Sequence, residues 1–320
     1  MLVLVEIIVP VFGLLAFGYA ATFTSVFDRA AGKALAAFVF YFAIPVMLFR
    51  NMALQDLPDA VPWGFLAAYF GGTLLIFALG AVAAGVLFGM RVEERGIVGF
   101  GASYGNVVLL GTPLVLASFG PEATLPFFLI LSFHSVLMFT AVTAVIEIGR
   151  GQGRSLRDLP QRIGSGLGRN PILLALLAGL LWHQLGLGLP AAADAWALMI
   201  AGAAGPCALF SMGASLRAYR LAGALGPAAL IVALKNLVHP LLVWLLCSFV
   251  FAMPPLWAKV AVVTAALPAG VNSYLFAERY DCGQRETAAA IVLSTALSVA
   301  TVAILLNLLG VAPGPSAGGP

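Results

Sequence analysis

The sequence predicts an all-α integral membrane protein with ten transmembrane helices, arranged as two inverted repeats of five helices each. Of its 320 residues, 62% are hydrophobic and only 9% are charged, and the mean hydropathy is +1.05. Apolar stretches of about 20 residues, the length that crosses the hydrocarbon of a bilayer, recur along the chain. These stretches lack the alternation of barrel strands, which favours helices.

The ten spans follow one another with short connections. We expect them at residues 3–22, 33–52, 62–88, 96–118, 122–148, 171–187, 195–216, 227–251, 256–277 and 285–309. No basic segment precedes the first apolar stretch, so we expect it to be a retained span and not a cleaved signal. Cys207, Cys247 and Cys282 lie in or beside spans without a paired spacing, which predicts neither a disulfide nor a metal site.

Basic residues concentrate on one side of this ten-span arrangement. The longest connection, 150–169, is rich in arginine, whereas the opposite side holds only Arg50 and Lys259. The positive-inside rule therefore places the Arg-rich loops in the cytoplasm and both termini outside. We expect the long loop to be a solvated linker that binds no nucleic acid, and the Gly/Pro/Ser-rich tail, 311–320, to be disordered.

Short matches recur in the same order in both halves of the chain. Residues 45–49 of span 2 match residues 206–210 of span 7, and residues 120–124 of span 5 match residues 283–287 of span 10. An odd number of spans per repeat makes the halves antiparallel, so that spans 4 and 9 cross near the midplane. The predicted division is a first repeat (1–149), a cytoplasmic linker (150–169), a second repeat (170–310) and a tail (311–320).

Span 4 carries helix-breaking residues in its middle. Pro113 lacks an N–H and crowds the carbonyl of Leu109, so we expect the helix to open here. Thr112 then occupies the N-cap of a new half-helix, with Pro113 at its first position. Asn106 lies just before this break. Irregular backbone at membrane depth is tolerated where it is buried in protein or lines a cavity, as at the substrate site of a transporter.

Span 9 has a break of its own, at Pro268, Gly270, Asn272 and Ser273. The two half-helix N-termini bring partial positive charge and free N–H groups, which together can bind an anion without a formal charge. The amides of Asn106 and Asn272 can orient a carboxylate there. The alternative for Asn106 is that it only caps backbone carbonyls that the break sets free.

Lys235 is the basic residue well inside a span, where charge is costly enough to indicate a role. It either offsets the negative C-terminal ends of half-helices, which we favour, or attracts the anion. His239, one turn later, and His134 in span 5 either make transport pH-sensitive or pack as neutral side chains. No carboxylate lies beside either break, which argues against a sodium/proton antiporter. Coupling to Na⁺ through oxygen ligands, or to H⁺, stays open.

An enzyme motif overlaps the first break. Residues 101–105 match G-x-S-x-G, with Ser103 as the candidate nucleophile. This motif needs a strand–turn–helix context that a chain of membrane helices lacks, so an intramembrane hydrolase using Ser103 and a histidine is disfavoured. The same small residues allow close helix packing. We expect no enzymatic activity and no cofactor.

The two breaks resemble a known family. Asn106-Val-Val-Leu-Leu-Gly111-Thr-Pro113-Leu114 resembles the broken-helix motif of the auxin efflux carrier family, which includes plant PIN-type carriers and bacterial members. Residues 266–280 resemble its second broken helix, and the resemblance covers essentially the whole chain. It implies a secondary carrier of organic anions in a bacterial-type inner membrane, working by elevator-type alternating access. The cytoplasmic loop is shorter here than in plasma-membrane plant carriers.

The resemblance further implies a scaffold of spans 1, 2, 6 and 7, a moving unit of spans 3–5 and 8–10, and a homodimer through the scaffold. Ser273 stands where plant carriers have a further proline, which makes malonate and similar carboxylates a better expectation than auxin. The alternatives are a sodium-coupled symporter of the bile-acid-symporter type and a non-transporting anion sensor. The expected substrate contacts are Ser103, Asn106, Thr112, Pro113, Pro268, Asn272 and Ser273.

Overall fold

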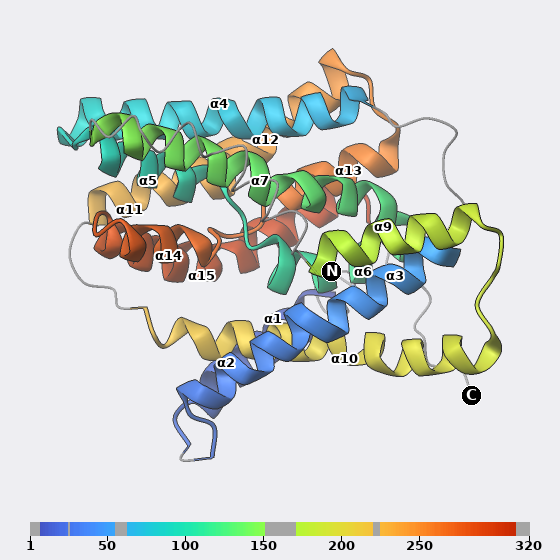
Figure 1. The fold of residues 1–320 in the computed structure, drawn as a ribbon. Coiled ribbons are helices and arrows are strands. Elements are labelled where there is room, and N and C mark those ends of the chain that lie inside the picture. Colours follow the sequence, from blue (N-terminus) through green and yellow to red (C-terminus); the bar gives the residue numbers. More distant parts are fainter. Residues whose placement is uncertain (1–6, 25, 55–62, 151–170, 220–224, 312–320) are drawn as a thin grey trace.

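The computed structural model describes residues 7–24, 26–54, 63–150, 171–219 and 225–311, and these are almost entirely helical (Figure 1). The expected linker and tail lie outside the described residues, apart from Arg150 and Val311. Within the described ranges there is no β-strand, and the extended pairing is confined to an isolated bridge between Gly105 and Ala269.

The helices follow the expected spans along the chain. The first half contains α1 (Val9–Ala21), α2 (Arg29–Phe38), η2 (Val39–Ala43), α3 (Ile44–Leu54), α4 (Trp63–Phe88), α5 (Val92–Ser103), η3 (Val107–Gly111), α6 (Thr112–Phe119), η4 (Pro121–Ala123) and α7 (Thr124–Gly149). The second half contains α9 (Pro171–Gln184), α10 (Ala191–Leu216), α11 (Leu225–Ala233), η5 (Leu234–Val238), α12 (His239–Leu245), η6 (Leu246–Val250), α13 (Pro255–Ala265), α14 (Asn272–Arg279) and α15 (Gln284–Leu308).

Several of these helices are long enough to span a membrane. When contiguous pieces are joined, 6 helices of the described chain are long and apolar enough to cross a membrane. They are Ala30–Leu54, Trp63–Phe88, Pro121–Gly149, Ala191–Leu216, Leu225–Val250 and Gln284–Leu308. Shorter apolar helices, among them Val107–Phe119 and Pro255–Ala265, come from the spans predicted to be broken. The all-α membrane class is therefore confirmed, and the ten-span inverted repeat stays a prediction.

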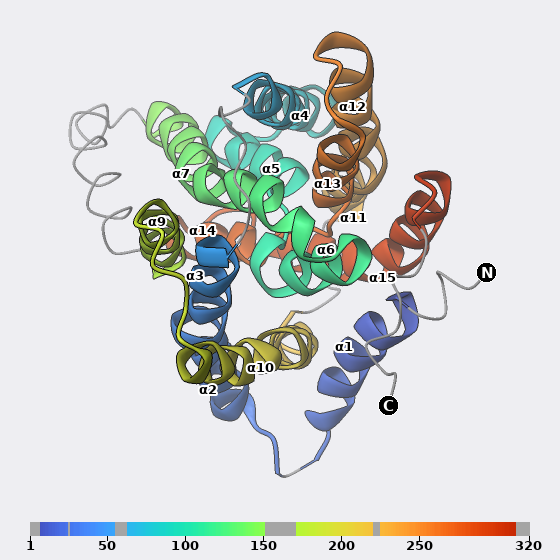
Figure 2. The same cartoon turned by 90° about the vertical axis from the view of Figure 1, so that its right-hand side faces the viewer.

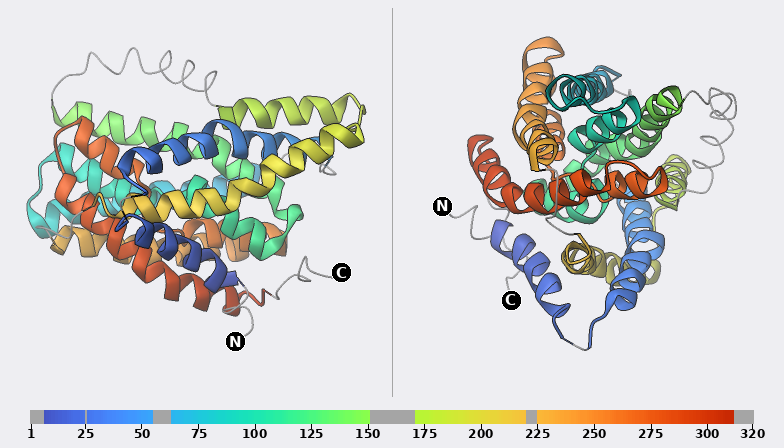
Figure 3. Two further views of the ribbon diagram at one scale, coloured as in Figure 1. Left: turned by 90° about the horizontal axis from the view of Figure 1, so that it is seen from below. Right: turned by 90° about the vertical axis from the view of Figure 1, so that its left-hand side faces the viewer.

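The helices form two groups when the molecule is viewed from either end (Figures 2 and 3). One group consists of α1, the continuous helix α2–η2–α3, α9 and α10; α4 to α7 and α11 to α15 form the other. Within the first group, α1 and α10 pack backbone to backbone. A β-carbon added at Gly18 would collide with the carbonyl of Phe210, and one at Gly213 with the carbonyl of Leu15. Glycine is thus required at this crossing.

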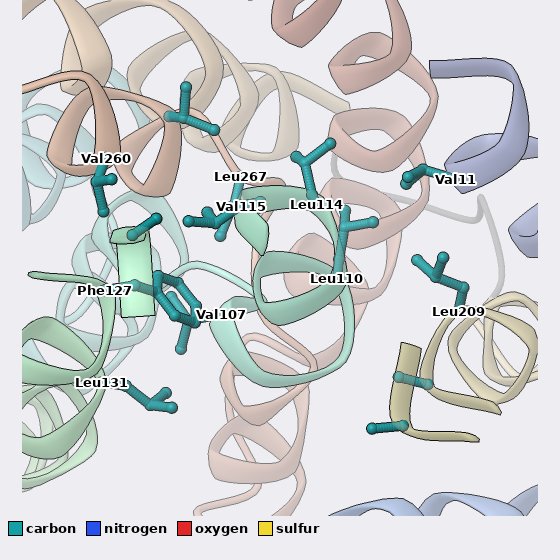
Figure 4. Close-up of a cluster of buried hydrophobic side chains, with 14 of the residues drawn as sticks. Val11, Val107, Leu110, Leu114, Val115, Phe127, Leu131, Leu209, Val260 and Leu267 are labelled. Atoms are coloured by element: carbon teal, nitrogen blue, oxygen red, sulfur yellow. The ribbon is translucent and has the colours of Figure 1, made fainter. Parts of the chain in front are cut away.

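The helix Val107–Phe119 lies at the boundary between the two groups (Figure 4). Its buried Leu110 and Leu114 lie toward Leu209 of α10 and Val11 of α1. On its other side lie Phe127, Val260 and Leu267, which belong to the second group. One apolar cluster therefore runs across the boundary and positions the beginning of this helix between both groups.

Candidate functional site

The first break lies at residues 104–106 and not at Pro113. Helix α5 ends at Ser103, Tyr104 is extended, and the next helix begins at Val107. The expectation that the chain opens at Pro113, with Thr112 as the N-cap, is wrong because a π-helical turn precedes the proline. In this wide turn the N–H of Thr112 bonds to the carbonyl of Val107, so the helix passes through Pro113 without breaking.

The second break pairs with the first. It connects the end of α13, Ala265, with the start of α14, Asn272. The N–H of Asn106 donates to the carbonyl of Pro268 (2.9 Å), and the N–H of Gly270 donates to the carbonyl of Tyr104 (2.8 Å). The two breaks therefore lie side by side, and each satisfies backbone groups that the other leaves free.

Glycine at position 270 makes this pairing possible. A β-carbon there would stand 2.9 Å from the carbonyl oxygen of Gly105 and would press into the ring of Tyr104. The contact with the Gly105 carbonyl cannot be relieved without separating the paired segments, because it is a contact to backbone.

A cavity of 310 Å³ opens at the paired breaks. Its wall on one side comes from the helix α2–η2, and the rest comes from the first and second breaks, so both groups of helices contribute. None of the residues that line it carries a formal charge. The lining residues are Ala36, Ala37, Phe40, Tyr104, Gly105, Asn106, Val107, Val108, Leu109, Gly270, Val271 and Asn272.

The polarity of the cavity comes from two amides and a phenol. Asn106 is 7% exposed, and its amide nitrogen lies 2.7 Å from the sulfur of Met212 on α10. The amide of Asn272 donates to the hydroxyl of Tyr104 (2.9 Å), which lies 3.0 Å from the hydroxyl of Ser135. Tyr104 therefore fixes one amide of the cavity from behind.

Backbone N–H groups add to these side chains. The N–H of Val107 bonds to the carbonyl of Gly105 (2.9 Å), but the next N–H groups, those of Val108 and Leu109, have no carbonyl partner within the helix Val107–Phe119, and both residues line the cavity. At α14 the corresponding donors are largely used, because the N–H groups of Ser273 and Tyr274 bond to carbonyls of the second break. The first helix start thus offers more free donors to an anion than the second.

Five of the predicted contacts do not line the cavity. The hydroxyl of Ser103 donates to the carbonyl of Gly99 (2.8 Å), and that of Ser273 donates to the carbonyl of Gly270 (2.8 Å). Thr112 is buried and bonds back toward Val107, Pro113 faces Gly205 of α10, and Pro268 contributes only its carbonyl. The cavity is lined instead by residues 104–109 of the first break and the helix that follows it, and by residues 270–272 of the second break.

Several residues that line the cavity were not among the contacts predicted from the sequence. The sequence could have indicated Tyr104, because it is a polar residue only two positions before Asn106. Ala36, Ala37 and Phe40 carried no such signal, because they are apolar residues of an unbroken apolar helix.

A buried polar cluster lies behind the first break. Lys235 donates to the carbonyl of Ala265, the last residue of α13, and its Nζ lies 3.2 Å from Nδ1 of His239. Through this contact the positive charge of Lys235 offsets the partial negative charge at the C-terminal end of α13. The ammonium stands directly behind the cavity, since a β-carbon at Gly105 would lie 3.3 Å from it. Across the described residues, no group of His, Cys, Asp and Glu is arranged to hold a metal ion.

Comparison with known proteins connects this geometry to a family. A family model described as "Membrane transport protein" matches residues 3–306. The chain belongs to the auxin efflux carrier family of membrane transport proteins. The resemblance carried by the two break motifs is thereby confirmed. Membership makes the chain a multi-pass membrane transporter and not an enzyme, which removes the hydrolase alternative at Ser103.

Individual relatives of the chain carry different names. A protein of Rhizobium meliloti (strain 1021) named "Putative malonate transporter" is 30% identical over 303 residues, which is 95% of each chain. The Oryza sativa subsp. japonica protein "Probable auxin efflux carrier component 5a" is 24% identical and matches over 94% of each chain. The Mus musculus "Lysosomal cholesterol signaling protein" is 25% identical, over 54% of this chain and 21% of its own length.

Proposed function

We propose that this transporter is a secondary carrier of small organic anions, with malonate and similar carboxylates as its first candidates. One observation carries the proposal: the cavity at the paired breaks gathers uncharged hydrogen-bond donors at a helix N-terminus, between both groups of helices. The likeness over 95% of its length to a relative named for malonate supports the choice of carboxylate.

The carboxylate would sit against Asn106, Asn272 and the free N–H of Val108. Hydrogen bonds to a charged group are worth about 1.5–3 kcal/mol each, and a helix N-terminus adds roughly half a positive charge. A cavity of 310 Å³ is at the small end of ligand sites, which suits a small anion. Without a formal cation in its lining, the site can release the anion as well as bind it.

Movement would carry the paired breaks past the first group of helices. In this proposal α1, α2–η2–α3, α9 and α10 are the scaffold, and the second group is the moving unit of an elevator. A homodimer through the scaffold, cytoplasmic Arg-rich loops and both termini outside belong to the same proposal, supported by the family and by the positive-inside pattern.

Purified protein in sealed proteoliposomes tests this function. Radiolabelled malonate, other dicarboxylates, small monocarboxylates and indole-3-acetate are offered with and without pH and sodium gradients. We expect uptake of at least one carboxylate that exceeds uptake into empty liposomes and is competed by unlabelled anion. Binding without accumulation under any gradient would instead support an anion sensor, and accumulation that requires sodium would support a symporter of the bile-acid type.

A further inference from the structure

His134 belongs to a buried polar cluster that the proposed anion site does not use. The cluster joins α4, α7, η5 and α12, and its members are fully buried. They are Tyr69, Thr73, His134, Lys235 and His239.

Lys235 and His239 have a complete hydrogen-bond pattern. The Lys235 ammonium donates to Nδ1 of His239 (3.2 Å), so the ring hydrogen of His239 lies on Nε2. That nitrogen lies 3.2 Å from the hydroxyl of Thr73, which itself donates to the carbonyl of Tyr69 (2.8 Å). With His239 neutral, Lys235, His239 and Thr73 all take part in hydrogen bonds. His239 therefore has no free ring nitrogen to accept another proton.

His134 is the opposite case. Neither ring nitrogen has a hydrogen-bond partner among the described residues, although the side chain is 0% exposed. The hydroxyl of Tyr69 is likewise buried without a partner, and the Tyr69 ring centroid lies 6.1 Å from those of both His134 and His239. Neutral His134 already carries one N–H, and protonation would add a second N–H, on the nitrogen that is an acceptor in the neutral ring. The hydroxyl oxygen of Tyr69, which has no partner in the described part of the chain, is the available acceptor.

One aromatic ring separates His134 from the cavity. The imidazole stacks on Tyr104, with ring centroids 4.5 Å apart and planes at 29°, and the hydroxyl of Tyr104 binds Asn272. The titratable groups that face His134 are Tyr69 from α4, Tyr104 from the first break, and Lys235 with His239 from η5 and α12. The charge of Lys235 opposes a proton on His134 while the cavity is empty, and a bound anion offsets that charge.

We propose, on the basis of the proposed function, that His134 takes up a proton when the anion binds, so that anion and proton cross the membrane together. Binding linkage is reciprocal, so the proton strengthens anion binding by the same factor. Na⁺ would bind at His134 less well than a proton does. Hard cations take oxygen ligands, whereas His134 presents ring nitrogens and lies near the Lys235 ammonium.

The test compares two modes of malonate transport in proteoliposomes. Counterflow at equal pH on both sides reports binding and movement, whereas accumulation under a gradient of one pH unit, acid outside, reports coupling. For wild type we expect both, with accumulation of up to about tenfold at one proton per anion when the membrane potential is held at zero. For His134→Gln we expect counterflow to persist and accumulation to vanish. Tyr69→Phe keeps the imidazole and should reduce accumulation alone, which covers the case that His134→Gln does not fold.

His183→Gln, at the end of α9 outside the cluster, is the matched control and should behave as wild type. Unchanged accumulation in both His134→Gln and Tyr69→Phe, or wild-type accumulation that ignores the pH gradient, would overturn the proton site while leaving the carrier intact. Absence of counterflow for every anion in wild type would overturn the proposed function itself, and the proton site with it.

Discussion

Two asparagine amides supply most of the side-chain polarity of the cavity, and their surroundings differ. Asn106 is held between the carbonyl of Pro268, through its own N–H, and the sulfur of Met212. A thioether is a weak acceptor, so the amide can exchange it for a carboxylate at small cost. Asn272 instead donates to a phenol, which sets its direction.

Asn106→Ala should weaken malonate binding by roughly 10- to 100-fold, because one hydrogen bond to a charged group, worth about 1.5–3 kcal/mol, is lost. The backbone bond to Pro268 survives, so the fold should persist. Calorimetric titration of detergent-purified protein measures the change. Asn307→Ala, an exposed asparagine on α15, is the control. Wild-type affinity in a well-folded Asn106→Ala variant would remove this amide from the site.

Tyr104→Phe should weaken binding less, by about three- to tenfold, because it removes only the partner that orients Asn272 and a neutral hydrogen bond is worth about 0.5–1.5 kcal/mol. The same titration applies. Tyr41→Phe removes a hydroxyl from an exposed tyrosine and should have no effect. A loss as large as that of Asn106→Ala would mean that the Tyr104 hydroxyl touches the anion directly.

At the scale of elements, glycine decides which helices can approach one another. Gly213 of α10 and Gly18 of α1 lie where the two backbones meet, so this part of the proposed scaffold is packed without side chains between the helices. Gly13 is on the same α1 helix, yet nothing lies within 4 Å of the β-carbon position there.

Gly213→Ala should therefore destabilise the protein by about 1–3 kcal/mol, the usual cost of overpacking, because α1 and α10 must separate. The expected measurement is a lower thermal unfolding midpoint in detergent. Gly13→Ala, in open space and with better helix propensity, should keep or slightly raise the midpoint. Equal midpoints for both variants would show that α1 and α10 are farther apart than described.

At the scale of the whole molecule, the cavity has walls from both groups of helices. Ala37 belongs to the proposed scaffold and Val108 to the proposed moving unit, and both line the cavity. If transport requires these walls to slide past one another, then joining them must stop it.

Ala37→Cys with Val108→Cys, in a background where Cys207, Cys247 and Cys282 are replaced, provides this test. A short bifunctional thiol reagent should abolish counterflow, and a reducible reagent should allow recovery after reduction. The single-cysteine variants treated in the same way are the controls. Full counterflow in cross-linked protein, with cross-linking verified by mass spectrometry, would contradict the sliding movement.

Much of the fold was predictable because the bilayer imposes one length and one polarity on every span. The location of the first break was not predictable. Proline disrupts a straight helix, but it is accommodated after a π-helical turn, and the sequence near Pro113 does not reveal that turn. The pairing of Gly105 with Ala269 holds the chain open six residues before Thr112, at Asn106. The local helix-breaking tendency of Pro113 therefore predicted the wrong position, because the long-range pairing determines where the chain opens.

The site was predictable to the extent that it is polar. Asn106 and Asn272 stand out in apolar spans, as do Lys235, His239 and His134. Ser103 and Ser273 stand out equally, but their hydroxyls bond to carbonyls one turn back, a local bond that only the folded backbone reveals. The scaffold wall of alanines and Phe40 has no polar signature at all.

The most direct measurement is a structure of the protein with malonate bound, determined by cryo-electron microscopy in lipid nanodiscs. We expect density for the anion at the paired breaks, with carboxylate oxygens within hydrogen-bond distance of Asn106, Asn272 and the N–H of Val108. Density for the anion far from both breaks, with the cavity between α2 and Asn106 empty, would show that the substrate binds elsewhere.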